Sequence, residues 1–542
     1  RPTQNSASAT TTAEFCVGRH QGFVLNQQRF KIETNEPEAG ACLQVIQDAK
    51  IACKQAPTSK AIRLILKTNE TTAQGRLQSA QIIFMQPCTL LLAARAAAAP
   101  ITTALAIAFT TLATAAESPT AAPRWFKGNL HTHSLWSDGN DYPEMIADSY
   151  KRAGYHFLAM SDHNVLAEGA RWLELKAPAA VKGEVVQKGG GAVLEKYLAR
   201  FGSAWVEQRE TDGKKAVRLK PLAEYRPLVE ESGRFLMIPG MEVTSSWKRP
   251  KTATEPEMGG PVHMNLTNPV SLVAPIAADN AVEIMRRSVD AVLAQREKTG
   301  QPMFLHLNHP NFVWGVTAEE LMQVHGEKFF EVYNGHPTVH NEGDATRLST
   351  DAMWDVILTR RLAELKLDVM YGIGVDDGHD YHQLILGKSN PFRGWVMVRA
   401  RHLTPESIVL AMEAGDFYSS SGVVLTDVTR ADKTLALEIQ AEPGVTYTTQ
   451  FIGTRRGYDP TSQLMPAPST EKSPRKTLPH RRYSKDVGAV LAEVKGLKAA
   501  YTLKGDELYV RAKIVSSKVK HNPGVTGEVE SAWTQPLIGP AK

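Results

Sequence analysis

The sequence predicts an α/β protein in which a β/α barrel is followed by an antiparallel β-sandwich. From residue 125 to about 422, apolar β-rich runs alternate with helical patterns, which is typical of parallel strands joined by helices. From about residue 426, short alternating strands separated by Gly, Pro and Asp replace that pattern. We therefore expect a barrel domain over residues 120–425 and an accessory β-sandwich over residues 426–542.

Seven strand–helix units are expected in the barrel. The strands are expected at RWFKGNL, YHFLAM, RFLMIPGMEV, PVHMNL, MFLHLNH, FFEVYNG and DVMYGIGV. Helices are expected near residues 142–153, 280–298 and 349–365, and the second of these ends at Gly300, a good helix stop signal. Residues 165–232 interrupt the alternation, so we expect an insertion there that is helical and overhangs the site.

Two further helices are predicted by their start signals. Thr317 and Glu320 have the spacing of a capping box, in which each residue satisfies a backbone N–H of the other. In Thr404-Pro405-Glu406, proline stands at the first helical position, where its missing N–H costs nothing. These signals place a short helix before the sixth strand and a last helix after the seventh.

The first part of the chain has a different character. Residues 1–84 show no sustained period and no motif, and we interpret them as an upstream extension absent from the mature protein. Residues 85–116 combine one arginine, a long apolar run and a small-residue ending, which is the layout of a secretory signal peptide. We therefore expect export to the periplasm or extracellular space without a stable membrane anchor. The length of the apolar run leaves a transmembrane segment as the alternative.

Cysteine placement and charge exclude some kinds of chemistry. All four cysteines (Cys16, Cys42, Cys53 and Cys88) precede the expected cleavage site, so the mature chain has no disulfide or thiolate chemistry. The net charge is +5, and Lys and Arg are dispersed apart from a short run near residues 472–482. That run is typical of a solvated loop, and we expect no nucleic-acid partner.

Histidine and carboxylate residues recur where the predicted strands end. Strand alternation points His131 and His133 to the same face, and a Ser-Asp-Gly turn returns Asp138 toward them. Imidazole and carboxylate bind zinc, manganese or iron, and no thiolate joins them. Because nine such ligands are too many for one ion, we expect two or three divalent ions (Zn, Mn or Fe). The expected ligands are His131, His133, Asp138, His163, Glu242, His263, His309, Asp377 and His379.

Barrel closure is expected to bring these ligands together, because the C-terminal strand ends of a barrel meet at one face. Asp162 and Asp376 are expected to orient ligands or manage protons. The expected loop 245–260 offers basic side chains on that face. The expected contacts of an anionic substrate are Lys248, Arg249, Arg347 and His336. Structural roles are expected for His156, His306, His325, His340 and His402. His382 is also expected to be structural, but it is near enough to the site to contact the ligands.

The ordered set HTHSLWSDG, SDHN, a glutamate after a strand, NHPN and D-x-H resembles the PHP (polymerase and histidinol phosphatase) superfamily over residues 124–422. The signal sequence, barrel and sandwich ending in AWTQP look most like secreted members of the CehA/McbA group. The resemblance implies a distorted (β/α)7 TIM-like barrel with a di- or trinuclear site. It assigns one metal to His131, His133, Glu242 and Asp377, a second to Asp138, His163 and His379, and a third to Glu242, His263 and His309, with Glu242 bridging.

A metal-dependent hydrolase follows from this ligand set. Two nearby cations lower the pKa of a metal-bridging water, which then serves as the nucleophile, and they stabilise the negative charge of the transition state. The first hypothesis is a phosphoesterase acting on small anionic phosphomonoesters or phosphodiesters, favoured by the superfamily and the basic loop. The second is a carboxylic ester or carbamate hydrolase. The third is an exported metal-containing binding protein without catalysis.

Overall fold

The computed structural model describes residues 122–176, 189–466 and 476–540 with their side chains. Contacts divide the chain into two units, Arg1–Thr114 and Ala115–Lys542. In the first unit only two short antiparallel pairs are described: β1 (Thr10–Thr11) with β2 (Ile32–Glu33), and β3 (Leu66–Thr68) with β4 (Ala80–Ile82). The expected upstream extension and signal peptide otherwise lie outside the described residues, so they stay predictions.

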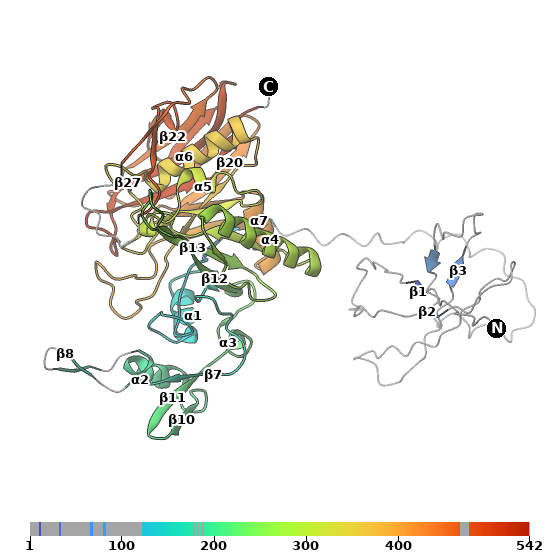
Figure 1. The fold of residues 1–542 in the computed structure, drawn as a ribbon, viewed down its shortest axis with the longest axis vertical. Helices are drawn as coiled ribbons and strands as arrows, with labels where there is room; N and C mark the ends of the chain where they lie inside the picture. Colours follow the sequence, from blue (N-terminus) through green and yellow to red (C-terminus); the bar gives the residue numbers. More distant parts are fainter. Residues whose placement is uncertain are drawn as a thin grey trace, which may run out of the picture. The chain divides into compact units, whose positions relative to one another are not determined.

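One large mixed sheet organises the second unit (Figure 1). Its first part runs through parallel pairs β5–β6, β6–β12, β15–β16 and β16–β17, so the C-terminal ends of these strands share one edge. The strands in spatial order are β17 (Tyr371–Val375), β16 (Phe329–Asn334), β15 (Phe304–Leu307), β13 (Met258–Thr267), β12 (Leu236–Arg249), β6 (Phe157–Met160), β5 (Arg124–Asn129), β18 (Trp395–Ala400) and β19 (Phe417–Ser420).

The expectation of parallel strands throughout is wrong for β13. This strand is antiparallel to both β12 and β15. Residues 245–260, expected as a loop, form most of a hairpin in which Thr244 pairs with His263 and Arg249 with Met258. A hairpin needs only a short connection, whereas a parallel crossover needs a dozen residues or more, and residues 250–257 provide only the former. A closed (β/α)7 barrel is therefore not confirmed.

Helices are few, and the three with predicted start or stop signals are present. Asn280 caps α4 (Ala281–Thr299) by accepting from the Glu283 amide, and the helix ends at Gly300 in the left-handed region. The capping box at Thr317 starts α5 (Ala318–Leu321), and Thr404 caps α7 (Pro405–Glu413). Outside the insertion, the remaining α-helices of the described residues are α1 (Pro143–Arg152) and α6 (Thr350–Arg360). Helix α6 continues as a π-helical turn over Arg361–Leu365.

The insertion is only partly helical, which corrects the expectation for residues 165–232. Its elements lie together beside α1 in Figure 1. Leu135 and Trp136, just after His133, share a buried cluster with Tyr197 and Val217 of the insertion, so this segment packs on the turn that follows the first histidines. The elements are β7 (Arg171–Glu174), β8 (Ala179–Val181), β9 (Glu184–Val186), α2 (Gly190–Phe201), β10 (Gln208–Thr211), β11 (Lys214–Leu219) and α3 (Leu222–Val229).

The C-terminal strands continue the large sheet because β28 pairs with β19. A second, three-stranded sheet faces them, and a shared hydrophobic cluster contains Leu435 and Tyr501 from that sheet together with Phe451 and Ile514 from the large one. The domain boundaries themselves stay predictions. The strands are β20 (Leu425–Ala431), β21 (Thr434–Ile439) and β26 (Lys498–Thr502) in the small sheet, and β22 (Tyr447–Arg455), β25 (Ala489–Lys495), β27 (Glu507–Val519), β28 (Val529–Thr534) and β29 (Leu537–Ile538) in the large one.

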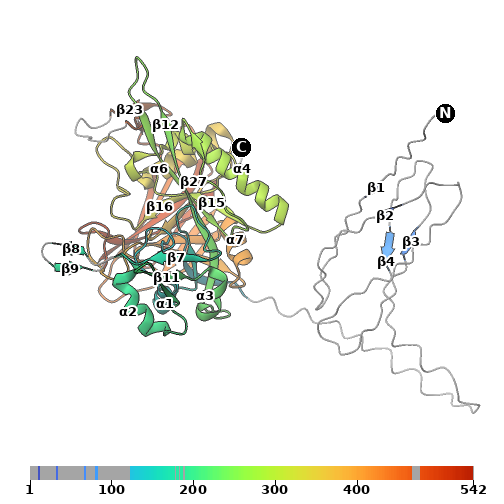
Figure 2. The ribbon, with the colours of Figure 1, turned by 60° about the horizontal axis from the view of Figure 1, so that its bottom comes forward.

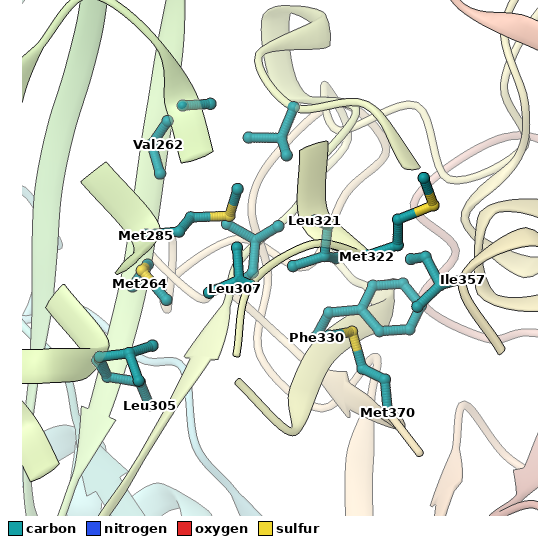
Figure 3. Packing of buried hydrophobic residues seen from close by; sticks show 14 of the residues in the cluster. Val262, Met264, Met285, Leu305, Leu307, Leu321, Met322, Phe330, Ile357 and Met370 are labelled. Atoms are coloured by element: carbon teal, nitrogen blue, oxygen red, sulfur yellow. The ribbon is translucent and has the colours of Figure 1, made fainter. Parts of the chain in front are cut away.

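The main core lies between the sheet and α4, α5 and α6 (Figure 3). Met264 of β13 and Leu307 of β15 point into it, and Met285 of α4 and Ile357 of α6 pack from the helices. Figure 2 shows the β12–β13 hairpin projecting from the second unit; Met258, the first residue of β13, bridges to Lys476, which precedes β24 (Arg481–Tyr483), the partner of β23 (Ser462–Leu464). Within the described residues, no helix is both long and apolar enough to cross a membrane.

Glu327, just before β16, is expected to make stability depend on pH. Burial raises the pKa of this carboxyl to about 8, although the Phe329 and Lys328 amides and Arg361 oppose the shift. The folded pKa exceeds the ordinary value of 4.5. The favourable contribution of this carboxyl to the free energy of unfolding is therefore complete below about pH 4.5 and is lost as the pH rises through 8. Glu327→Gln should flatten the fall in Tm between pH 5 and 8. Parallel Tm profiles of variant and parent would contradict this assignment.

Candidate metal centre

Backbone hydrogen bonds extend the sheet beyond its strand ends and through the ligand segments. The Asp377 amide donates to the His131 carbonyl (3.1 Å), and the Glu242 amide donates to the Asp162 carbonyl (3.1 Å). A parallel bridge joins Thr132 to Gly378, and another joins His163 to Glu242. These bonds fix residues from β5, β6, β12 and β17 side by side, so ligands far apart in sequence lie at one edge.

Four buried side chains form the centre of the cluster. His131 Nε2 and His133 Nε2 lie 3.1 Å apart, and each lies 3.2–3.3 Å from Glu242 Oε2. Asp377 Oδ1 is 3.3 Å from both histidine atoms. Donors about 2.1 Å from a tetrahedral ion are separated by roughly 3.4 Å. These five distances therefore have the spacing of metal ligands; His131 groups closely with His133 and Glu242 and, separately, with His309 and Asp377.

Asp138, His163 and His379 form a second group on the solvent side. Asp138 Oδ1 lies 3.3 Å from His379 Nε2, and Asp138 Oδ2 lies 3.5 Å from His163 Nε2. The side chain of Asp138 is 56% exposed and that of His163 is 26% exposed, whereas Glu242 is fully buried. This group marks the open side of the cluster. It is the expected second ligand set, with the His133 ring stacked on His379.

Glu242 joins these side chains to a third group. Its Oε1 lies 2.9 Å from His263 Nδ1 and 3.7 Å from His309 Nε2, while its Oε2 lies 3.0 Å from His163 Nδ1. The short approach of His263 Nδ1 to Glu242 does not have hydrogen-bond geometry, so this buried nitrogen makes no hydrogen bond among the described residues. A buried nitrogen without a partner is costly unless an ion or water completes it. The donor set therefore fits a metal shared through Glu242.

The charges within the cluster are mutually dependent. Burial would raise the pKa of Glu242, but His131 and His163 hold it well below its ordinary value. Burial likewise opposes the protonation of His131, yet Asp377, Glu331 and Glu242 raise its pKa well above 6.5. The carboxylates thus attract positive charge into the buried cluster, as metal ligands must. Asp377 also has a φ of 52°, a strained conformation for a non-glycine residue.

Asp162 and Asp376 hold the ligand loops in place. Asp162 accepts from the Ser134 amide (2.7 Å) and from the hydroxyls of Ser134 (2.7 Å) and Ser137 (2.6 Å). His133 directly precedes Ser134, and Asp138 directly follows Ser137. Asp376 accepts from Tyr150 and from the Arg393 and Gly394 amides, and burial raises its pKa. Both carboxylates are occupied by these bonds, so the structure gives them a role in orientation.

The structure separates Lys248 and Arg249 from the cluster and pairs Arg347 with other side chains. Lys248 is exposed and lies 3.4 Å from Glu257. Six residues of extended strand, roughly 20 Å, separate it from Glu242, and Arg249 is one residue further. Arg347 lies over the Trp314 ring and pairs with Asp344. His336 reaches the cluster, with its ring 5.6 Å from that of His379.

Glu331, a carboxylate outside the expected set, also contacts the cluster. Glu331 Oε1 lies 2.6 Å from His131 Nδ1 and 3.3 Å from His306 Nε2, so His306, expected to be structural, shares a carboxylate with a ligand. The signal was present in FFEVYN, where one charged residue interrupts an apolar strand that is buried throughout. A buried carboxylate needs partners, and the histidines provide them.

No family model matches this chain, and no curated protein matches it. Among solved structures, the chain is similar to a two-domain protein from Bacteroides vulgatus ATCC 8482 that contains a "predicted PHP-like metal-dependent phosphoesterase". The two share 15% identity, with a TM-score of 0.30, and the match covers 70% of this chain and 96% of the other.

Proposed function

We propose that this protein is a metal-dependent hydrolase of the PHP type that cleaves small phosphoesters. The observation that supports this most directly is the set of four buried donors at His131, His133, Glu242 and Asp377, spaced 3.1–3.3 Å apart in the measured pairs. Further donors adjoin the same glutamate on both of its oxygens. The ordered motifs of the sequence favour the same superfamily and, with it, phosphoester chemistry.

The side chains have separate tasks in this proposal. Divalent ions, when bound, would supply Lewis-acid activation of water and of the ester. His131, His133, Glu242 and Asp377 would hold one ion in the buried part of the cluster. Asp138, His163 and His379 would hold another on the open side, where an anionic substrate can approach. His336, beside His379, is the nearest candidate contact for that substrate.

The exposure of the ligand set favours catalysis over a purely structural metal. Structural sites are closed by protein ligands, whereas catalytic sites keep a position open. Here Asp138, His163 and His379 are partly exposed, while the four central side chains (His131, His133, Glu242 and Asp377) are buried. A binding protein that used metal only for stability would not need that opening.

The Thr132–Gly378 bridge, which links the segments after the first and last parallel strands, supports a distorted (β/α)7 barrel.

His133→Ala provides the test of this function. The parent is expected to contain divalent metal and to hydrolyse p-nitrophenyl phosphate or bis-p-nitrophenyl phosphate. Loss of an outer-sphere partner typically costs about 10–100-fold in metal affinity or activity, so loss of a ligand should cost at least about 100-fold. The measurements are metal content and kcat/KM.

The matched control is His402→Ala, because His402 is exposed and lies outside the cluster. It should retain the metal content and turnover of the parent. Activity confined to p-nitrophenyl acetate would contradict the phosphoesterase and favour a carboxylic ester or carbamate hydrolase. Bound metal without turnover of any of the three esters would favour the binding protein.

Export, expected from residues 85–116, is proposed separately and is tested by locating the protein in its host.

A further inference from the structure

We propose that Glu331 is the positioning residue of this centre, holding three of its ligands in register through one carboxylate. The inference rests on the proposed metal binding but adds a residue that none of the ligand motifs contains. Glu331 lies in β16, is 1% exposed, and has no direct access to a substrate. Its two oxygens receive hydrogen bonds from four groups, and each oxygen serves a different part of the cluster.

The first oxygen fixes the His131 ring. His131 Nδ1 donates to Glu331 Oε1 at 2.6 Å, which leaves Nε2 as the atom that faces His133, Glu242 and Asp377. His306 Nε2 lies 3.3 Å from the same oxygen and holds it from the other side. A carboxylate that accepts from the far nitrogen of a metal-binding histidine fixes both the tautomer and the ring orientation.

The second oxygen reaches two further ligands. Glu331 Oε2 accepts from the His309 amide at 2.7 Å, which sets the backbone position of that ligand. It also accepts from Asn334 Nδ2 at 2.8 Å, and the same Nδ2 donates to Asp377 Oδ2 at 3.1 Å. Asn334 therefore ties Asp377 to Glu331, and its own carbonyl oxygen accepts from the His336 amide. The carboxylate thus connects β5, β15 and β17 through β16.

The alternative is that His131, His306 and Glu331 hold an additional ion. The distance between His131 Nδ1 and Glu331 Oε1 argues against it, because 2.6 Å is the length of a charge-assisted hydrogen bond. Two donors around one ion lie roughly 3.4 Å apart. His131 also directs its other nitrogen at the main cluster. The geometry thus favours support of the existing ligands.

Glu331→Gln tests the proposal. The amide NH2 of glutamine must face either the His131 N–H or the His309 and Asn334 N–H groups, so at least one of these bonds becomes a contact between two donors. Zinc and manganese affinities, measured on the whole protein by competition with a chelator, are expected to fall by about 10–100-fold. Glu331→Asp, which keeps the charge but withdraws the carboxylate by one methylene, should also weaken metal binding.

Glu327→Gln is the matched control. Glu327 is a buried glutamate four residues earlier that bonds only the Lys328 and Phe329 amides among its measured hydrogen bonds, so its change should leave the metal affinities unaltered. Folded Glu331→Gln or Glu331→Asp protein that binds zinc and manganese as the parent does would overturn the proposal. If Glu331→Gln does not fold, Glu331→Asp decides. A parent that binds metal but hydrolyses no ester would contradict the proposed function and leave this inference standing.

Discussion

Replacing Glu242 by glutamine is expected to lower kcat/KM for phosphoesters by about 1000-fold or more, the largest catalytic effect of any single change in this chain. Lewis-acid stabilisation supplies several kcal/mol, and about 4 kcal/mol corresponds to a thousandfold change in rate. The two oxygens of Glu242 lie near histidines of all three proposed groups, at 2.9–3.7 Å. Its amide analogue keeps the volume but loses the charge that these groups share.

Metal analysis of the same variant separates this explanation from misfolding. Glu242→Gln should remain folded by circular dichroism and should lose bound metal together with activity. Glu144→Gln is the control, because Glu144 is equally buried but accepts from Tyr197 and Trp205, away from the cluster. Normal activity in Glu242→Gln, or an equal loss in both variants, would show that Glu242 is not the shared ligand.

The convergence of the expected ligand residues could be predicted because it depends on local rules. His131 and His133 stand two residues apart after one strand, and Asp377 follows another. The histidine pair and the aspartate therefore both lie where parallel strands end. Convergence then follows from sheet geometry and needs no knowledge of the sequence distance between the strands. All nine expected residues lie in groups whose donor atoms are within 4.8 Å of one another.

The direction of β13 could not be predicted in the same way. Its sequence, like that of its neighbours, is mainly apolar, and only the length of the connection from β12 distinguishes a hairpin from a crossover. Reading residues 245–260 as a loop also misplaced Lys248 and Arg249, which the extended strands carry away from Glu242. The charge in FFEVYN marks Glu331 as a buried carboxylate, but no local pattern reveals its partners, His131 after β5 and His306 in β15.

Removing Arg511 is expected to give the largest loss of stability, about 3–5 kcal/mol, because it would leave a buried carboxylate without its partner. Arg511 of β27 is fully buried and binds Asp355 of α6 through Nε (2.8 Å) and Nη2 (2.6 Å). Its Nη1 also lies 3.1 Å from Asp351. These contacts join the C-terminal strands to α6. Urea unfolding of Arg511→Met, at fixed pH and metal content, measures the loss.

The paired variant shows whether the loss comes from the unpaired charge or from the missing contact area. Asp355→Leu together with Arg511→Met replaces the whole ion pair by apolar side chains, a change that is often neutral in buried sites. We therefore expect the double variant to be more stable than Arg511→Met alone, although Tyr509 would lose its bond to Asp355. A loss below about 1 kcal/mol in Arg511→Met would mean that water reaches Asp355 and that the pair contributes no more than a surface salt bridge.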